Sequence, residues 1–135
     1  GKLLIIYIPA QILGCLLGVM LANVFFEHDI LELSTKNRDG FHIFLSEIIA
    51  TFGLIFIIFA TQKDGKITIA ASVATYIMAG YWFTSSTSFA NPAVAIARTF
   101  TDSFTGINYL NTPTYILAEF LGALIAVYFI KKLIK

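Results

Sequence analysis

Four apolar runs divide this chain, and each is long enough to cross a lipid bilayer as a helix. They cover residues 3–26, 43–61, 67–84 and 114–130. The hydrocarbon core of a bilayer is about 30 Å thick, which a helix of roughly 20 apolar residues spans. Inside that core every backbone N–H and C=O group must be paired within the protein, so only helices and closed barrels can cross it. Runs of this length predict an all-α membrane protein with four transmembrane helices.

The composition agrees with a membrane location. Of the 135 residues, 58% are hydrophobic and only 13% are charged, whereas a typical soluble domain has about 25% charged residues. The net charge of +1 does not suggest a nucleic-acid partner. The single cysteine, Cys15, excludes an internal disulfide and a cysteine-based metal site. The apolar runs contain no catalytic or metal-binding constellation, so we expect no enzymatic activity, no cofactor and no metal.

The stretch between the third and fourth runs, residues 85–100, is too polar and too short to cross a bilayer. A Ser/Thr cluster is followed there by Asn91-Pro92-Ala93 and an alanine-rich segment. Asn is a favoured N-cap residue and Pro suits the first helical position, so a helix is predicted to begin at Asn91. At membrane depth, irregular backbone survives only when it is buried in protein or lines a wet cavity. We therefore expect a re-entrant half-helix over residues 91–100; an ordinary surface loop with a plain N-cap is the alternative.

The distribution of basic residues predicts the orientation in the membrane. Four spans and a re-entrant segment place six lysines on one side: Lys2, Lys63, Lys66, Lys131, Lys132 and Lys135. The other side has Lys36, Arg38 and Arg98, which nearby acidic residues offset. Because Lys and Arg favour the cytoplasmic side, both termini are expected in the cytoplasm of a cell-membrane protein, and the half-helix is expected to enter from outside.

An internal repeat relates the first and fourth runs. Residues 7–18 and 115–126 are identical at six of twelve positions. The two runs cross the membrane in opposite directions, which is typical of an inverted-topology repeat; chance similarity between two apolar helices is the alternative. Two spans and a half-helix precede the second copy, but only six residues precede the first. We therefore expect about 65 residues, the first part of the fold, to lie outside this chain.

Four short motifs accompany this topology. They are Tyr7-x-x-Ala10-Gln11-x-x-Gly14, Glu47-x-x-x-Thr51-Phe52, Asn91-Pro92-Ala93 and Gly122-Ala123. Together they resemble the aquaporin/glycerol-facilitator (major intrinsic protein) family over essentially the whole chain, as its third to sixth transmembrane helices with the second Asn-Pro-Ala loop. The resemblance implies an aquaporin-like right-handed helical bundle, a pore in each protomer, a homotetramer surrounded by membrane lipid, and no cofactor.

The resemblance also implies roles for individual residues. The Asn91 amide would donate to a permeating water or hydroxyl, while the positive end of the half-helix dipole repels cations. Glu47 would accept N–H bonds from the Asn-Pro-Ala loop and support its shape; the alternative is an acid near the outer interface that water satisfies. Glu119 would serve in packing through hydrogen bonds, as its neutral repeat partner Gln11 suggests; proton or ion binding is the alternative.

The resemblance places three positions of the selectivity filter at Ala79, Ser88 and Val94. The family usually has Arg directly after Asn-Pro-Ala, where this chain has Val94. A widened filter without Arg implies a passive channel for water and small neutral solutes, such as glycerol-like polyols or neutral metalloid hydroxides. The alternatives are a strict water channel, a fragment that does not conduct without the rest of the fold, and, less favoured, a proton-coupled transporter that uses Glu47 or Glu119.

Arg98 leaves two interpretations open. It lies seven residues after Asn91, so a continuous helix would place both on nearly the same face. Arg98 is then either a displaced filter cation or the partner of Asp102, four residues further on. The two histidines, His28 and His42, are expected in solvated outer segments.

Overall fold

The computed structural model describes residues 2–133, and all regular structure in that range is helical. The helices are α1 (Lys2–Phe25), α2 (Phe41–Thr61), α3 (Lys66–Phe83), α4 (Pro92–Ala97) and α5 (Thr112–Leu133), with a single 3₁₀ turn at Arg98–Phe100 after α4. Each expected span corresponds to one long helix, and the expected half-helix corresponds to α4 with its 3₁₀ turn. The chain is an all-α membrane protein.

Three of the helices, α1, α2 and α5, are long and apolar enough to cross a membrane. The helix α3, which corresponds to the expected span 67–84, has 18 residues and is not among these three helices. It begins with Lys66 and carries Tyr81 and Trp82 near its other end.

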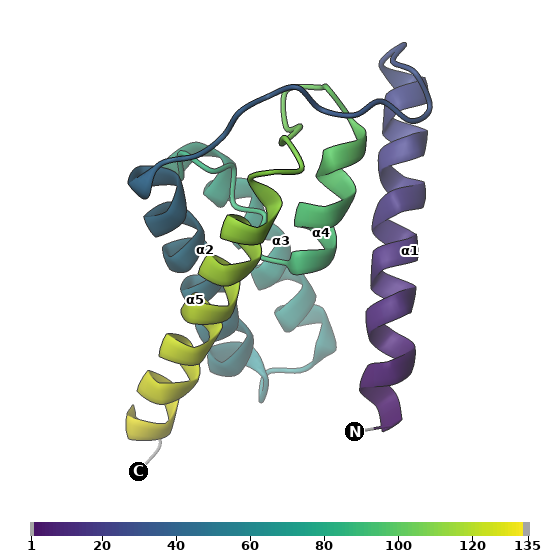
Figure 1. Ribbon diagram of the computed structural model, residues 1–135. Coiled ribbons are helices and arrows are strands. Elements are labelled where there is room, and N and C mark those ends of the chain that lie inside the picture. Colours follow the sequence, from purple (N-terminus) through teal and green to yellow (C-terminus); the bar gives the residue numbers. More distant parts are fainter. Residues whose placement is uncertain (1, 134–135) are drawn as a thin grey trace.

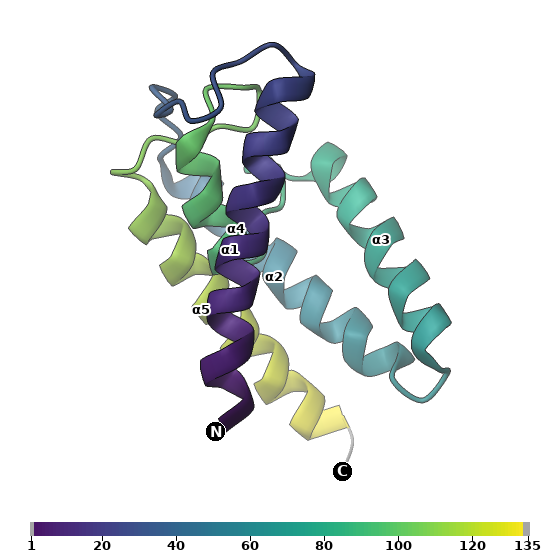
Figure 2. The same ribbon diagram turned by 90° about the vertical axis from the view of Figure 1, so that its right-hand side faces the viewer.

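The helices α2 and α5 pack against each other along much of their length, and α4 lies between α5 and α1 (Figure 1). The helix α3 joins α2 through a short turn and stands away from α1 (Figure 2). The α2–α5 contact is close at Gly122, where an added Cβ would lie 2.5 Å from the carbonyl oxygen of Ile48. A glycine is therefore required for this approach of the two backbones.

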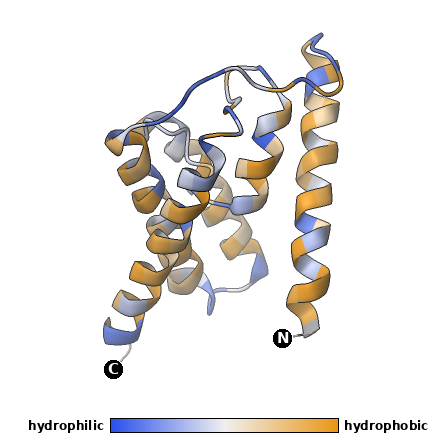
Figure 3. Ribbon diagram, viewed as in Figure 1, coloured by the Kyte–Doolittle hydropathy of each residue, from blue (hydrophilic) through white to orange (hydrophobic). Residues whose placement is uncertain are grey.

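The start of α1, the α2–α3 turn and the end of α5 lie at one end of the molecule (Figure 1). Lys63, Lys66, Lys131 and Lys132 belong to that end, whereas Lys135 lies outside the described residues. Apolar residues dominate the helices between the two ends (Figure 3). We call the end with the lysines the basic end and the opposite one the outer end.

At the outer end, two loops are joined by hydrogen bonds. The loop after α1 runs across the top of the molecule to α2 (Figure 1). In that loop Ser34 N–H donates to Thr99 O at 2.9 Å, and Lys36 O accepts from Asn108 N–H at 2.8 Å. The carboxylate of Asp102 accepts from Thr35 N–H at 2.9 Å. These bonds tie the loop to the segment that follows α4, and so help to hold α4 in place.

Candidate functional site

Asn91 caps α4. Its backbone is extended, with φ −158° and ψ 120°, and its side-chain Oδ1 accepts from Ala93 N–H at 2.9 Å. Pro92 follows at the first helical position, as the sequence predicts. Since Oδ1 serves the cap and no residue among 2–133 accepts from Nδ2, the two amide N–H groups of Asn91 remain available to another acceptor.

The loop before Asn91, residues 85–90, is backbone-strained. Thr87, Ser88 and Ala90 have φ values of 67°, 52° and 50°, in the left-handed region that favours glycine. For a residue with a Cβ this conformation costs roughly 1–2 kcal/mol. Three such residues within four positions persist only if the surrounding structure holds them there.

Glu47 on α2 helps to keep this loop in its strained conformation. Its two carboxylate oxygens accept from Phe89 N–H and from Ala90 N–H, each at 2.9 Å. Glu47 is completely buried. The hydrogen bonds that the family resemblance implies are thus present, and the water-satisfied interfacial position is not what the structure has.

Glu119 on α5 holds the next N–H group of the chain. Its Oε1 accepts from Asn91 N–H at 3.1 Å, while its Oε2 has no partner among the described residues. The side chain is 1% exposed. Two carboxylates from two helices therefore bind three successive backbone N–H groups, from Phe89 to Asn91. We did not predict that Glu119 contacts this loop; its matched position with Gln11 in the repeat was the available signal.

A cavity of about 350 Å³ lies beside Asn91, and we call it the Asn91 cavity. Its wall is mostly apolar, formed largely by α2 and α5, with a few polar residues among them. The lining residues are Gln11, Thr51, Leu54, Ile55, Ile58, Ala90, Asn91, Pro92, Glu119, Phe120 and Ala123. An apolar wall with few polar groups is typical of sites for small molecules.

The three expected filter positions do not line a common cavity. Val94 and Arg98 line a cavity of about 220 Å³ between α1 and α4, which Cys15 also lines; we call it the Val94 cavity. Ala79 is exposed on α3, and Ser88 is buried against Gly80, where an added Cβ would lie 2.5 Å from Ser88 Oγ. Neither Ala79 nor Ser88 lines the Val94 cavity.

Arg98 does not pair with Asp102, so that interpretation is wrong. The α-helix ends at Ala97 and tightens to a 3₁₀ turn, which removes the spacing on which a contact four residues apart depends. Asp102 instead turns toward the loop after α1, with Lys36 Nζ at 3.9 Å. The Thr35 N–H bond holds the pKa of the Asp102 carboxyl below its usual value.

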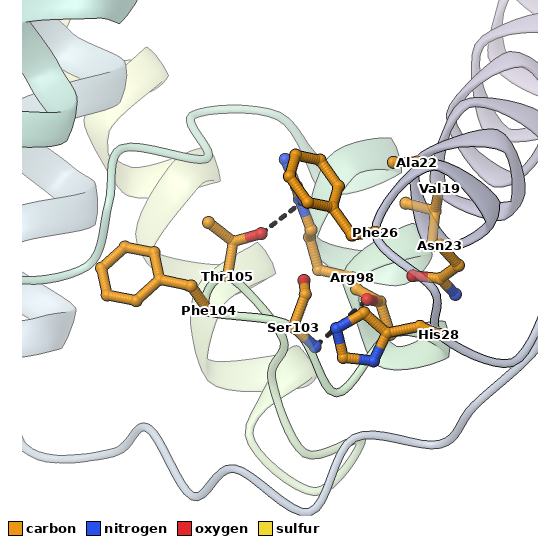
Figure 4. Close-up of a pocket in the computed structure, with 10 residues that line it drawn as sticks. Val19, Ala22, Asn23, Phe26, His28, Arg98, Ser103, Phe104 and Thr105 are labelled. Carbon is orange, nitrogen blue, oxygen red and sulfur yellow. Dashed lines mark hydrogen bonds between the residues drawn. The ribbon is translucent and has the colours of Figure 1, made fainter.

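Arg98 points into a larger cavity of about 510 Å³ at the outer end, which we call the outer cavity. It donates there to the hydroxyl of Thr105, near Phe26 and His28 (Figure 4). His28 is partly exposed and lies 3.1 Å from Glu32, and His42 is exposed. No three His, Cys, Asp or Glu side chains within residues 2–133 are grouped so that they could hold a metal ion.

Comparison with known proteins gives one strong match. The chain is 45% identical over 120 residues to Aquaglyceroporin AqpS of Rhizobium meliloti (strain 1021), a match that covers 89% of this chain and 52% of that protein. The chain thus spans about half the length of the curated relative it matches. No family model matches the chain, and no solved structure matches it significantly.

Proposed function

Because the chain belongs to the aquaporin/glycerol-facilitator (major intrinsic protein) family, we propose that it contributes one pore loop and four membrane-spanning helices to a passive channel for water and small neutral solutes. The relative is named an aquaglyceroporin, and three helices of the chain are long and apolar enough to cross a membrane. In this proposal α3 is the fourth crossing, α4 enters from the outer side, and the basic end faces the cytoplasm.

The observation that carries the proposal is the geometry of Asn91. Its free amide N–H groups stand at the N-terminus of α4, and Asn91 lines a mostly apolar cavity. A water molecule or a solute hydroxyl can accept from this amide, whereas the apolar wall offers few competing partners. The positive end of the helix dipole disfavours cations and hydronium at the same place. The three hydrogen bonds to Glu47 and Glu119 keep the donor in position.

The finer proposal is that the filter is wide and lacks Arg. Val94 presents a short apolar side chain beside α1, where an Arg would fill space and add a charge. Ala79 and Ser88, which the family resemblance also places at the filter although they do not line the Val94 cavity, are small as well. A rim of this kind admits glycerol-like polyols or neutral metalloid hydroxides, and Arg98 supplies the remaining cation near the mouth. Complete protomers would form a homotetramer in the cell membrane.

The test replaces Val94 in the full-length protein. Val94→Arg should lower glycerol flux into proteoliposomes by at least tenfold while osmotic water flux persists. Val94→Met is the matched control, because it adds bulk without charge and should lower glycerol flux less. If the parent protein already passes water but excludes glycerol, the strict water channel is correct and the wide filter is wrong. If the parent passes neither, the conducting proposal itself fails.

A further inference from the structure

Arg38 reaches the strained loop of residues 85–90 from the outer end of the molecule. It lies in the loop between α1 and α2, which runs across that end (Figure 1). Its backbone N–H donates to Asn111 Oδ1 at 3.0 Å, and Asn111 O accepts from Tyr115 N–H at 3.3 Å in the first turn of α5. The start of α5 therefore fixes the backbone from which the half-buried side chain of Arg38 extends.

The guanidinium of Arg38 meets the 85–90 loop at three places. It donates to Thr87 Oγ1 at 3.4 Å and to Ser85 O at 3.5 Å, and its central carbon lies 5.9 Å from the centroid of the Phe89 ring. Both bonds are long for hydrogen bonds, so the guanidinium is held by the three contacts together. A planar cation with five N–H donors can make all three at once, whereas a lysine ammonium is a point charge on a flexible stem.

These contacts complement those that Glu47 and Glu119 make. A loop without regular secondary structure needs partners for its N–H groups and also for its acceptor groups. The two carboxylates accept from the N–H groups of residues 89–91. The Arg38 guanidinium donates to acceptors nearer the start of the loop. Acids on two helices and a cation from the outer loop thus hold different parts of one strained segment.

We propose that Arg38 is a positioning residue through which the outer loop sets the solute preference of the channel. The inference rests on the proposed function, in which Ser88 occupies one position of the filter. Ser88 has a φ of 52°, and Arg38 contacts both of its chain neighbours, Thr87 and Phe89. Its side chain is buried against Gly80. A strained conformation persists only while its surroundings enforce it, so loss of the guanidinium lets Ser88 relax from this place.

Two simpler roles for Arg38 leave the solute preference unchanged. A positive charge at the outer end needs neither a planar group nor the Thr87 hydroxyl. A purely stabilising role would lower glycerol and water flux in the same proportion, because fewer folded protomers would conduct. The ratio of the two fluxes therefore separates positioning from stability.

The experiment measures glycerol flux and osmotic water flux of the full-length protein in proteoliposomes. Arg38→Gln should change their ratio by about threefold or more, for which a change of about 0.65 kcal/mol in the barrier for one solute is enough. Arg38→Lys should change the ratio in the same direction but less, because it keeps the charge and loses the planar group. Lys36→Gln is the matched control and should leave the ratio unchanged. It removes a cation from the same loop, but its Nζ lies 3.9 Å from Asp102 Oδ1 instead.

The proposal is overturned if both Arg38 variants keep the parent ratio, or if Lys36→Gln changes it equally. A parent ratio in Arg38→Lys alone also overturns it, since charge would then suffice. If Arg38→Gln does not fold, the Lys variant decides by itself.

A variant of Thr87 tests whether Arg38 acts through the 85–90 loop. Thr87→Val removes the hydroxyl that Arg38 contacts and keeps the β-branched shape of the side chain. Residues that act through one contact are not additive, so the double variant with Arg38→Gln should change the ratio by less than the product of the two single changes. A change equal to that product would overturn the proposed route.

Hydrogen exchange separates failure of this inference from failure of the proposed function. The protection of Phe89 and Ala90 N–H should fall in Arg38→Gln and stay at the parent level in Lys36→Gln, whether or not the protein conducts. If the parent passes neither solute, the proposed function fails, and lower protection still supports the hold of Arg38 on the loop. If the parent conducts and neither the flux ratio nor the protection responds to Arg38→Gln, this inference alone is wrong.

Discussion

Replacement of Glu47 by Gln should destabilise the protein far more than the same replacement at Glu119. Glu47 accepts two N–H bonds, one on each oxygen, at 2.9 Å. A Gln keeps one acceptor but turns an NH₂ group toward the second N–H. One charge-assisted bond worth about 1.5–3 kcal/mol becomes a neutral bond of about 1 kcal/mol, and the other N–H is left buried and unpaired at a further cost of about 1–3 kcal/mol.

The expected loss for Glu47→Gln is therefore about 1.5–5 kcal/mol, a large part of the 5–15 kcal/mol that stabilises a typical domain. The same bonds offset the strain of Thr87, Ser88 and Ala90, so the loop should relax in the variant. Glu119 differs because only its Oε1 is bonded. Its Gln variant keeps a carbonyl for Asn91 N–H and places the NH₂ where no described donor lies, so it loses only the difference between a charge-assisted and a neutral bond, about 0.5–2 kcal/mol.

The assay is thermal unfolding of the full-length protein in detergent, together with expression yield and solute flux for both variants. Glu47→Gln should unfold at clearly lower temperature and fold in lower yield, whereas Glu119→Gln should stay close to the parent. Equal losses at both positions would contradict the difference in hydrogen bonding, in which both oxygens of Glu47 are paired but only one oxygen of Glu119 is. Normal folding of Glu47→Gln with an altered solute preference would instead make Glu47 a residue of the pore.

Three further predictions follow from packing, titration and chain length. Gly122→Ala should lower stability by about 1–3 kcal/mol, because its Cβ would overlap the Ile48 carbonyl oxygen; an unchanged unfolding temperature would contradict the close α2–α5 approach. Because the pKa of Asp102 is depressed in the folded protein, the stability that its carboxylate contributes is complete above pH 3.8, the usual pKa, and is lost as the pH falls through the lower pKa of the folded state. The protection factor of Thr35 N–H, which compares its exchange rate with the intrinsic rate at the same pH, should thus fall in acid, and Asp102→Asn should show this lower protection already at neutral pH; a protection factor in the parent that does not change with pH would argue against the anchor. Vesicles that contain only residues 1–135 should pass solute no faster than empty vesicles, since one half-helix encloses a pore from one side only; faster swelling would contradict this.

Local chemistry made much of the fold predictable. The length of the apolar runs at α1, α2 and α5 determines helices that can cross a bilayer, because backbone hydrogen bonds have no other partner there. The cap at Asn91 was predictable for the same kind of reason, since its side chain bonds an N–H only two residues away. The family resemblance rested on short motifs of this sort, and the 45% identity to an aquaglyceroporin confirms it.

Tertiary packing determined contacts that the sequence alone did not predict. The three N–H groups from Phe89 to Asn91 meet carboxylates that lie 28 to 43 positions away, and such a meeting depends on how α2 and α5 cross. A pair between Arg98 and Asp102 was one of the two interpretations that sequence spacing allowed, but the 3₁₀ turn and the outer loop separate the two residues. A helix cap and the length of an apolar run depend on residues within one segment, so the sequence determines them. The partners of a buried charge are determined only when separate helices come together.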